Sequence, residues 1–271
     1  MRQGLRVNRV TTSAFVIFHI GAVVALFFFS WKMLLLAIAM MTVANFPGIG
    51  MGFHRLLTHR SYKTPKIVEY VLTICGCLAL EGGPIWWVAW HRVHHKYTEQ
   101  IGLDPHTPRE GKFWSHMGWL IWNDPVLHDR DILTKFAPDL CKDPFQRTIN
   151  RFPWVPLTVL GLAFLRIWGL PGVLWGVFVA VILIWHATWL VNSATHLWGS
   201  QPYKITGTGD SRNNWWVALL TFGEGWHNSH HAFPTSARHG LRWYQFDPNW
   251  YGITLLKFLG LAWDVQTPKD I

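Results

Sequence analysis

Two stretches close to the amino terminus carry no charged side chain. Residues 10–31 and 33–53 contain no Lys, Arg, Asp or Glu. A helix needs about 20 apolar residues to cross the hydrocarbon core of a bilayer, so each stretch is long enough to span it. The whole chain is 50% hydrophobic and only 14% charged, below the charged share of an average soluble domain. These observations predict an integral membrane protein.

Two further apolar stretches occur in the second half of the chain. Residues 152–168 form a short one with Arg166 near its end, and residues 173–192 form another after a Gly-Leu-Pro-Gly turn at 169–172. The sequence therefore predicts an all-α protein with four transmembrane helices. We find no repeat and no composition break, so we expect a single domain over residues 1–271.

The basic residues predict the orientation of these helices. Arg2, Arg6 and Arg9 precede the first span, whereas the two turns on the other side hold only Lys32 and Arg166. Because Lys and Arg collect on cytoplasmic flanks, we expect a cytoplasmic amino terminus. Residues 54–151 and 193–271 then form one helical cap on the cytoplasmic side.

The net charge of +9 and a pI near 9.7 raise the question of nucleic-acid binding. The basic residues are, however, spread through the predicted cytoplasmic segments among tryptophans. Anionic lipid headgroups, an anionic substrate carrier or an acidic electron donor explain them more simply. We therefore expect a membrane surface as partner and no nucleic acid.

Nine of the fifteen histidines fall into three boxes and one outlying position. In two boxes the spacing is H-x-x-H-H, which on a helix brings positions i, i+3 and i+4 to one face. Eight box histidines exceed the ligands of one ion, since zinc usually takes four, so the sequence predicts two metal ions in a cytoplasmic cap. Imidazole suits iron, copper, zinc and nickel, and ligand type alone does not choose among them. The predicted ligands are His54 and His59, then His91, His94 and His95, then His227, His230 and His231, and the outlier His196.

Several other polar residues have a possible role near the metals. Asn192 lies one turn before His196 and could hold a metal-bound water, and Asp104 and Glu224 could orient ligand N–H groups. An ordinary helix-cap or loop acid explains Asp104 and Glu224 equally well. For the remaining histidines we expect packing or supporting roles rather than ligation: His19, His186, His106, His116, His128 and His239.

Five further stretches are specific to one family: Gly52-Phe53-His54-Arg55-Leu56, Asp104-Pro105-His106, Trp114-Ser115-His116-Met117-Gly118-Trp119, the run from Ala187 to His196, and Gly223-Glu224-Gly225-Trp226-His227. Through them the chain resembles the integral-membrane fatty acyl desaturases of the stearoyl type. The resemblance covers almost the whole chain. It implies a non-haem di-iron centre held by the nine histidines, with Asn192 acting through water. It also implies four spans and a bent tunnel for the acyl chain, with Trp87, Thr188 and Trp189 in its wall. The implied product has a cis double bond at carbon nine.

The chemistry of such a reaction agrees with the residues. Removing two hydrogens from unactivated methylenes needs oxygen activated at a metal, so iron is expected as cofactor and O2 as co-substrate. The chain has neither a haem domain nor enough cysteines for an iron–sulfur cluster, so a separate ferredoxin, rubredoxin or cytochrome must supply electrons.

The form of the long-chain acyl substrate is indicated by a departure from the animal acyl-CoA members. Those members have Asn and an Arg-Asp pair where this chain has Gly82, Ala89 and Trp90. The sequence from Glu81 to Ile85 is more similar to that of bacterial and cyanobacterial members, which act on lipid-bound chains. Lys96, Arg109 and Lys112 could still bind a carrier phosphate, or form a basic patch that faces the membrane.

Three other functions are compatible with parts of the pattern. A histidine-box hydroxylase would use the same oxidant and is the nearest alternative. A haem-binding or metal-transporting bundle would place ligands inside opposing spans, whereas these histidines lie beyond the predicted span ends. A zinc metalloprotease is disfavoured because H-E-x-x-H is absent from the sequence.

Overall fold

The computed structural model describes residues 5–123, 129–205 and 209–268. Most of these residues are helical, as predicted. A short antiparallel pair also occurs, in which β1 (Arg6–Val7) pairs with β2 (Trp122–Asn123), so the all-α prediction needs this small correction. The helical elements, in chain order, are α1 (Arg9–Ala25), η1 (Leu26–Phe28), α2 (Trp31–Val43), η2 (Ala44–Thr58), α3 (Lys66–Cys77), α4 (Pro84–Tyr97), η3 (Pro108–Glu110), η4 (Trp114–Gly118), α5 (Trp119–Ile121), α6 (Arg130–Phe136), α7 (Pro138–Lys142), α8 (Pro144–Arg151), α9 (Val155–Val173), η6 (Leu174–Val179), α10 (Ala180–Ser193), η7 (Ala194–His196), α11 (Trp215–Leu220), α12 (His227–Ala232) and α13 (Pro248–Phe258).

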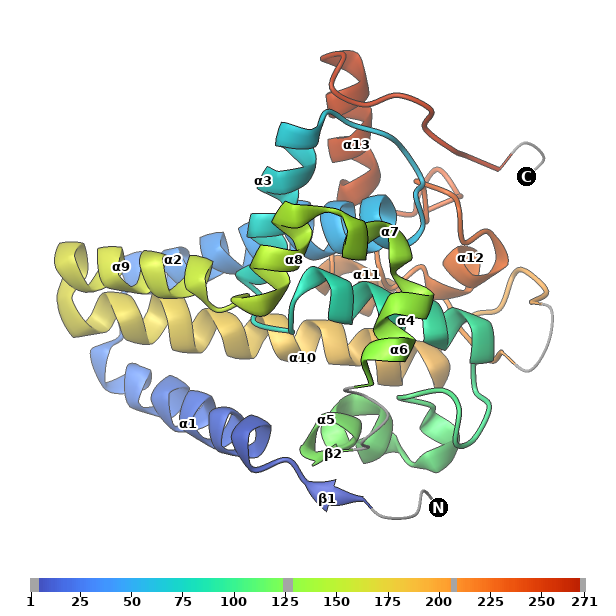
Figure 1. The fold of residues 1–271 in the computed structure, drawn as a ribbon. Helices are drawn as coiled ribbons and strands as arrows, with labels where there is room; N and C mark the ends of the chain where they lie inside the picture. Colours follow the sequence, from blue (N-terminus) through green and yellow to red (C-terminus); the bar gives the residue numbers. More distant parts are fainter. Residues whose placement is uncertain (1–4, 124–128, 206–208, 269–271) are drawn as a thin grey trace.

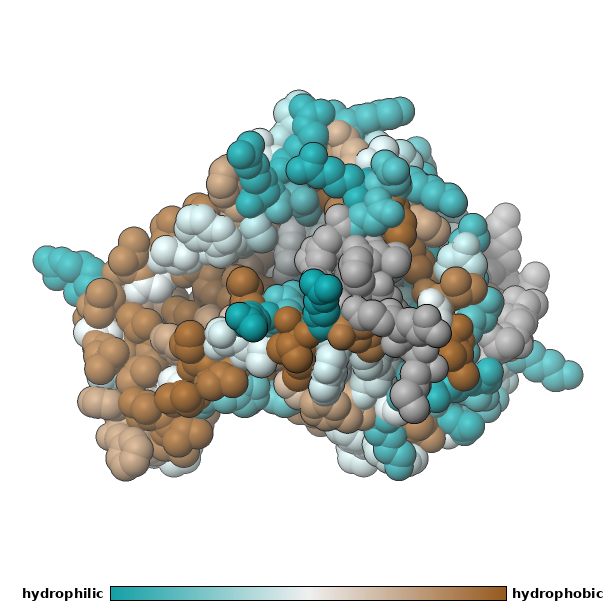
Figure 2. Space-filling model, turned by 60° about the horizontal axis from the view of Figure 1, so that its bottom comes forward, coloured by the Kyte–Doolittle hydropathy of each residue, from teal (hydrophilic) through white to brown (hydrophobic). Residues whose placement is uncertain are grey.

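Three of the described helices are long and apolar enough to cross a membrane: Arg9–Phe28, Trp31–Thr58 and Val155–His196. The first two confirm the predicted apolar spans at 10–31 and 33–53, although the second helix continues five residues further. The protein is therefore a membrane protein by the length and composition of its helices. Figure 2 shows apolar surface concentrated at the end of the molecule that Figure 1 builds from α1, α2, α9 and α10.

The third of these helices is not straight. Gly169 has φ 65° and ψ −156°, a backbone conformation that interrupts the helix at the predicted turn. Beyond it the chain reverses, so that α9 and α10 run side by side in Figure 1, and α9 packs on η6. The single 42-residue stretch thus contains two helical arms, one on each side of Gly169.

The second spanning helix ends in π-helical geometry. Over η2 the backbone N–H of His59 bonds the carbonyl of His54, 3.1 Å away and five residues earlier. Such i→i+5 turns are rare and often occur at functional sites. Here the wider turn brings the two histidines of the first box to one face, with ring centroids 4.9 Å apart. The first box thus lies at the end of the spanning helix rather than in a separate cap segment.

Helix α4, which carries the second box, is fixed at both ends. At its start, the Asn150 side chain accepts hydrogen bonds from the backbone N–H groups of Ile85 and Trp86, at 3.0 and 3.1 Å. Near its end, Arg92 donates to the carbonyls of Leu57 and Thr58, which close η2. Carbonyls at the end of a helix have no partner within it, so a cation satisfies them well. These contacts fix the positions of the first and second boxes relative to each other.

Helix α12, which carries the third box, is only six residues long and depends on its neighbours. The two residues of the box that are not histidines attach the helix to neighbouring segments. Asn228 exchanges two hydrogen bonds with the Tyr203 backbone. Ser229 exchanges two more with the Asn213 side chain, at 2.9 and 3.1 Å. The second and third boxes thus both lie on helices, the condition under which their spacing brings the histidines together.

Candidate metal centre

The nine predicted ligands come together as two separate groups. We call the first cluster A and the second cluster B, and within each the ligand atoms lie within 4.8 Å of one another. Cluster A contains His54, His59, His91, His95 and His230, and cluster B contains His94, His196, His227 and His231.

Each H-x-x-H-H box is shared between the two clusters. On α4, His91 and His95 are one turn apart and point into cluster A, while His94 points into cluster B. On α12 the pattern is reversed, because His227 and His231 enter cluster B and His230 enters cluster A. The outer i, i+4 pair of each helix therefore belongs to one cluster and the middle histidine crosses to the other.

The nitrogen atoms converge as the ligands of one ion do. In cluster A the Nε2 atom of His230 lies 3.0 Å from that of His54 and 2.8 Å from that of His95. In cluster B the Nε2 atom of His227 lies 3.0 Å from those of His196 and His231. Nitrogens that bind one ion at about 2.1 Å, at right angles to each other, are about 3 Å apart. The donor set of each cluster therefore fits a metal ion.

Burial keeps these imidazoles neutral, which ligation requires. The pKa values of six cluster histidines lie well below the usual value: His59, His91, His95 and His230 in cluster A, and His227 and His231 in cluster B. The main cause is burial of the rings, and the second is that neighbouring histidines disfavour a further positive charge. The buried Nε2 atom of His59 has no hydrogen-bond partner in the protein. A cation at the centre of cluster A would satisfy it.

Three carboxylates hold the far ring nitrogens of the clusters. The Nδ1 atom of His94 lies 3.0 Å from Asp104, that of His196 lies 3.0 Å from Glu99, and that of His54 contacts Glu224. A carboxylate on Nδ1 fixes the proton there and leaves the Nε2 lone pair for a metal. Asp104 and Glu224, both considered from the sequence, thus contact two of the predicted ligands, His94 and His54. Glu99 was missed by the sequence analysis, where its place four residues after His95 gave the only signal.

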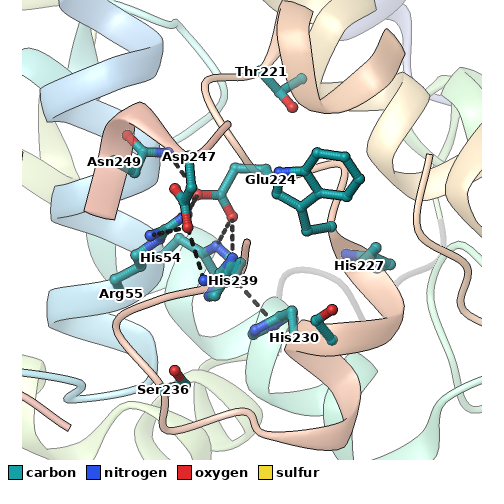
Figure 3. Close-up of polar contacts among 12 residues, drawn as sticks. His54, Arg55, Thr221, Glu224, His227, His230, Ser236, His239, Asp247 and Asn249 are labelled. Carbon is teal, nitrogen blue, oxygen red and sulfur yellow. Dashed lines mark hydrogen bonds and ion pairs between the residues drawn. The ribbon is translucent and has the colours of Figure 1, made fainter. Parts of the chain in front are cut away.

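Glu224 belongs to a buried ionic network that Figure 3 shows. Arg55 is fully buried and donates to Glu224 at 3.0 Å and to Asp247 at 2.9 Å. Asn249 also donates to Glu224, at 2.7 Å, and His239 Nδ1 lies 3.3 Å from its second oxygen. Burial raises the pKa of Glu224, but Arg55 and the two nearby histidines outweigh it and the pKa lies well below the usual value. Glu224 is therefore an anion that supports His54.

The other described histidines lie outside the two clusters. His106 packs on His94 with ring centroids 4.3 Å apart, and His239 packs on His230 at 4.5 Å. His19 and His186 contact each other at 3.2 Å, and His116 contacts the other nitrogen of His186 at 3.1 Å. His106 and His239 also belong to two smaller groups, with Asp104 and His94 and with Glu224 and His54, whose ligand atoms lie within 4.8 Å of one another. His128 lies outside the described residues.

A cavity of about 400 Å³ borders cluster A. We call it the aromatic cavity, because six tryptophans line it: Trp86, Trp87, Trp90, Trp119, Trp185 and Trp189. The three predicted tunnel residues, Trp87, Thr188 and Trp189, all lie in its wall, and so does Asn192. His91 lines it too, with its ring stacked on Trp87 at 5.0 Å. The cavity offers an apolar chain a path to the edge of cluster A.

Glu81 is the one described acidic residue in the wall of this cavity. One carboxylate oxygen accepts from the indole N–H of Trp87 at 3.2 Å, and the other is buried without a partner. Burial raises its pKa to about 7, although contacts with Thr188 and Trp87 oppose the shift. Near neutral pH, therefore, Glu81 exchanges between a neutral and a charged form.

The basic residues considered for a carrier phosphate do not gather at this cavity. Arg109 lies 3.2 Å from Glu99 and 3.4 Å from Asp210, and the Lys112 ammonium lies over the Trp198 ring. Lys96 lines a different cleft. None of the three is among the described residues that line the aromatic cavity.

Comparison with known proteins agrees with this arrangement. The fatty acid desaturase family model matches residues 6–254, which is nearly the whole chain. The chain belongs to the fatty acid desaturase family. It is 45% identical over 264 residues to the sn-1 stearoyl-lipid 9-desaturase of Anabaena variabilis, covering 96% of this chain and 94% of the relative.

Two further relatives show the range of the family. The sn-2 palmitoyl-lipid 9-desaturase of Nostoc sp. (strain 36) is 44% identical over 248 residues, covering 92% of this chain and 86% of the relative. The Acyl-CoA C20 Delta5-desaturase of Anemone leveillei is 45% identical over 245 residues, covering 90% and 77%. Similar identity to proteins named for different carriers means that identity alone does not select the carrier. The family does establish that this desaturase is an oxidoreductase.

Proposed function

We propose that this protein introduces a cis double bond at carbon nine of a saturated acyl chain carried by a membrane lipid. The observation that carries the proposal is the placement of cluster A against the aromatic cavity, where His91 belongs to both. The reaction consumes one O2, two electrons and two protons. With the two hydrogens taken from the acyl chain, these leave as two water molecules.

The nine cluster histidines would hold two iron ions, five imidazoles on one and four on the other. Iron would supply, with O2, the oxidising strength that no side chain has. Asn192, which lines the same cavity as His91, would hold a water molecule near the metals. Asp104, Glu99 and Glu224 keep the ligand rings in their orientation.

The protein would select the reacting methylene by how deeply the acyl chain enters the cavity. Methylenes offer no polar handle, so an enzyme can distinguish them only by how far the chain enters and where it bends. The Trp87 indole donates to the Glu81 carboxyl group at 3.2 Å, and both residues line the aromatic cavity. This hydrogen bond would help to fix the cavity wall beside His91.

A lipid-bound substrate is supported by the residues that replace the animal CoA contacts. Ala89 is fully buried and Trp90 is 4% exposed, so neither offers a polar contact to a headgroup in water. The apolar surface around α1 and α9 gives the same support, since a lipid would approach from the bilayer (Figure 2).

The proposed arrangement in the membrane has four crossings, formed by α1, by α2 with η2, and by the two arms around Gly169. The amino terminus and both clusters lie on the cytoplasmic side, in agreement with the basic residues that precede α1. The chain forms one domain, and a separate ferredoxin, rubredoxin or cytochrome supplies its electrons.

The test is fatty-acid analysis with double-bond location in cells that express the protein together with an acidic ferredoxin. The wild type should produce a new 9-monoene in membrane lipids, and His230→Ala should produce none. Immunodetection of His230→Ala in the membrane fraction and its iron content distinguish lost chemistry from lost protein. A hydroxy fatty acid in place of the monoene would overturn desaturation in favour of hydroxylation, and a full yield from His230→Ala would overturn the metal assignment.

A further inference from the structure

A second open space lies on the other side of the histidine clusters. This cleft has a volume of about 730 Å³, and among its lining residues are three histidines of the clusters: His59, His95 and His231. Four cationic residues also line it, Arg60, Arg92, Lys96 and Lys135, and we call it the basic cleft. None of its described lining residues is Asp or Glu.

The basic cleft and the aromatic cavity are separate. No described residue lines both of them. Along α4 the change occurs within one helical turn, because Trp87 and His91 border the aromatic cavity whereas His95 borders the basic cleft. Cluster A therefore lies between the space that admits an acyl chain and a polar opening to solvent.

The charge on the cleft is positive even when its nearest acid is counted. Asp139 forms ion pairs of 2.8 Å with both Arg60 and Arg92. Four cations less this one anion leave a local charge of +3 among these five described residues. Lys96 and Lys135 are exposed, and their ammonium groups lie 5.6 and 5.9 Å from the centre of the Phe136 ring. The rim thus combines exposed positive charge with an aromatic ring.

We propose that the basic cleft is the docking site of an acidic one-electron carrier protein, an inference that rests on the proposed function. Electrons need only reach the edge of a ligand ring, and three such rings form the floor of this cleft. An opposite charge on the partner accelerates the encounter and orients it. Two docking events deliver the two electrons of each turnover, and each oxidises one reduced carrier.

A lipid headgroup is the other anion that could occupy the cleft. The separation of the two spaces argues against it, because a headgroup in the cleft would place its acyl chain behind the ligand rings. In Figure 1 the end of α4 and helix α12 also lie at the opposite end of the molecule from the turn that joins α9 to α10. The cleft is therefore remote from the apolar end that the bilayer covers.

The test measures electron transfer directly. The iron-loaded full chain, in uncharged nanodiscs, is mixed without O2 with a reduced acidic [2Fe–2S] protein, and oxidation of the carrier is followed by stopped flow at increasing salt. For the wild type the second-order rate constant should fall steeply as salt rises. Lys135→Glu should lower it about 10-fold at low salt and flatten the salt dependence. Lys96→Gln should lower it about 3-fold.

Lys257→Glu is the matched control, since Lys257 is exposed on α13 and does not line the cleft. Its rate should equal the wild-type rate. If Lys135→Glu and Lys96→Gln also transfer electrons at the wild-type rate, the docking proposal is wrong.

A second assay distinguishes a failure of the docking proposal from a failure of the proposed function. In it a small uncharged reductant drives turnover, because such a reductant reaches the metal centre without docking. Under these conditions Lys135→Glu should form monoene at the wild-type rate with an unchanged KM for the acyl lipid. A raised KM with unchanged transfer from the carrier would assign the cleft to the headgroup and overturn the proposal. A wild type that forms no monoene with either reductant would overturn the proposed function itself.

Discussion

The rings of His95 and His231 stack with their centroids 4.4 Å apart and their planes 17° apart, although they belong to different clusters. One residue comes from α4 and the other from α12. Through this contact the two clusters lie directly against each other. Imidazoles from both helices thus belong to two adjacent clusters.

Removing a histidine from cluster B should release one metal ion. His227→Ala leaves three imidazoles in a cluster of four, so the purified protein should bind about one iron per chain in place of two. His116→Asn serves as control, because His116 lies outside both clusters. Metal analysis by mass spectrometry checks this prediction, which fails if His227→Ala retains two irons.

The carboxylates behind the ligands should control affinity without being ligands themselves. Asp104→Asn and Glu99→Gln should each weaken iron binding by about 10- to 100-fold while the fold is retained. The physical reason is that an amide holds the Nδ1 proton less firmly than a carboxylate does. Titration of the metal-free protein with Fe2+, with folding followed by circular dichroism, would show an unchanged Kd if these acids had no such role.

Arg55 should be one of the most sensitive positions for stability. Arg55→Met would leave Asp247 and Glu224 buried without their cation, at a cost of about 3 to 5 kcal/mol. Arg60→Met, at a side chain 65% exposed, should cost less than about 1 kcal/mol. Unfolding in mixed micelles should separate the two variants clearly, and equal stabilities would contradict the importance of the buried network.

Glu81 should give the protein a pH-dependent stability. Its pKa is raised by burial from 4.5 to about 7 in the folded state, so the folded state binds the proton more tightly than the unfolded state. Its contribution is therefore fully present below pH 4.5 and is lost as the pH rises towards about 7. The difference in unfolding free energy between the wild type and Glu81→Gln, measured across this range, should decrease with pH and then level off. A difference that is constant with pH would contradict the prediction.

Much of this arrangement can be predicted from sequence, because its signals are local. Runs without charge identified the first two spanning helices, and the two H-x-x-H-H boxes, whose spacing suits one face of a helix, both lie on helices. The resemblance to the desaturases indicated Trp87, Thr188 and Trp189 as cavity residues, and all three line the aromatic cavity.

The rest depends on contacts between distant segments. Nothing in the spacing of His54 and His59 predicts a π-helical turn, which follows from how η2 packs on α3 and α4. The division of each box between two clusters involves histidines of η2, α4, η7 and α12, which lie far apart in sequence. Arg55 gives no local sign of its partners, which lie 169 and 192 residues away in sequence. Glu99 has positive φ (59°) and turns back towards His196, a geometry that residue type does not reveal.

The most direct test of the account is an anomalous diffraction map recorded at the iron absorption edge from crystals of the active protein. The account predicts two iron peaks per chain, one surrounded by the five histidines of cluster A and the other by the four of cluster B. A single peak, or a peak outside both clusters, in a preparation that still desaturates would contradict it.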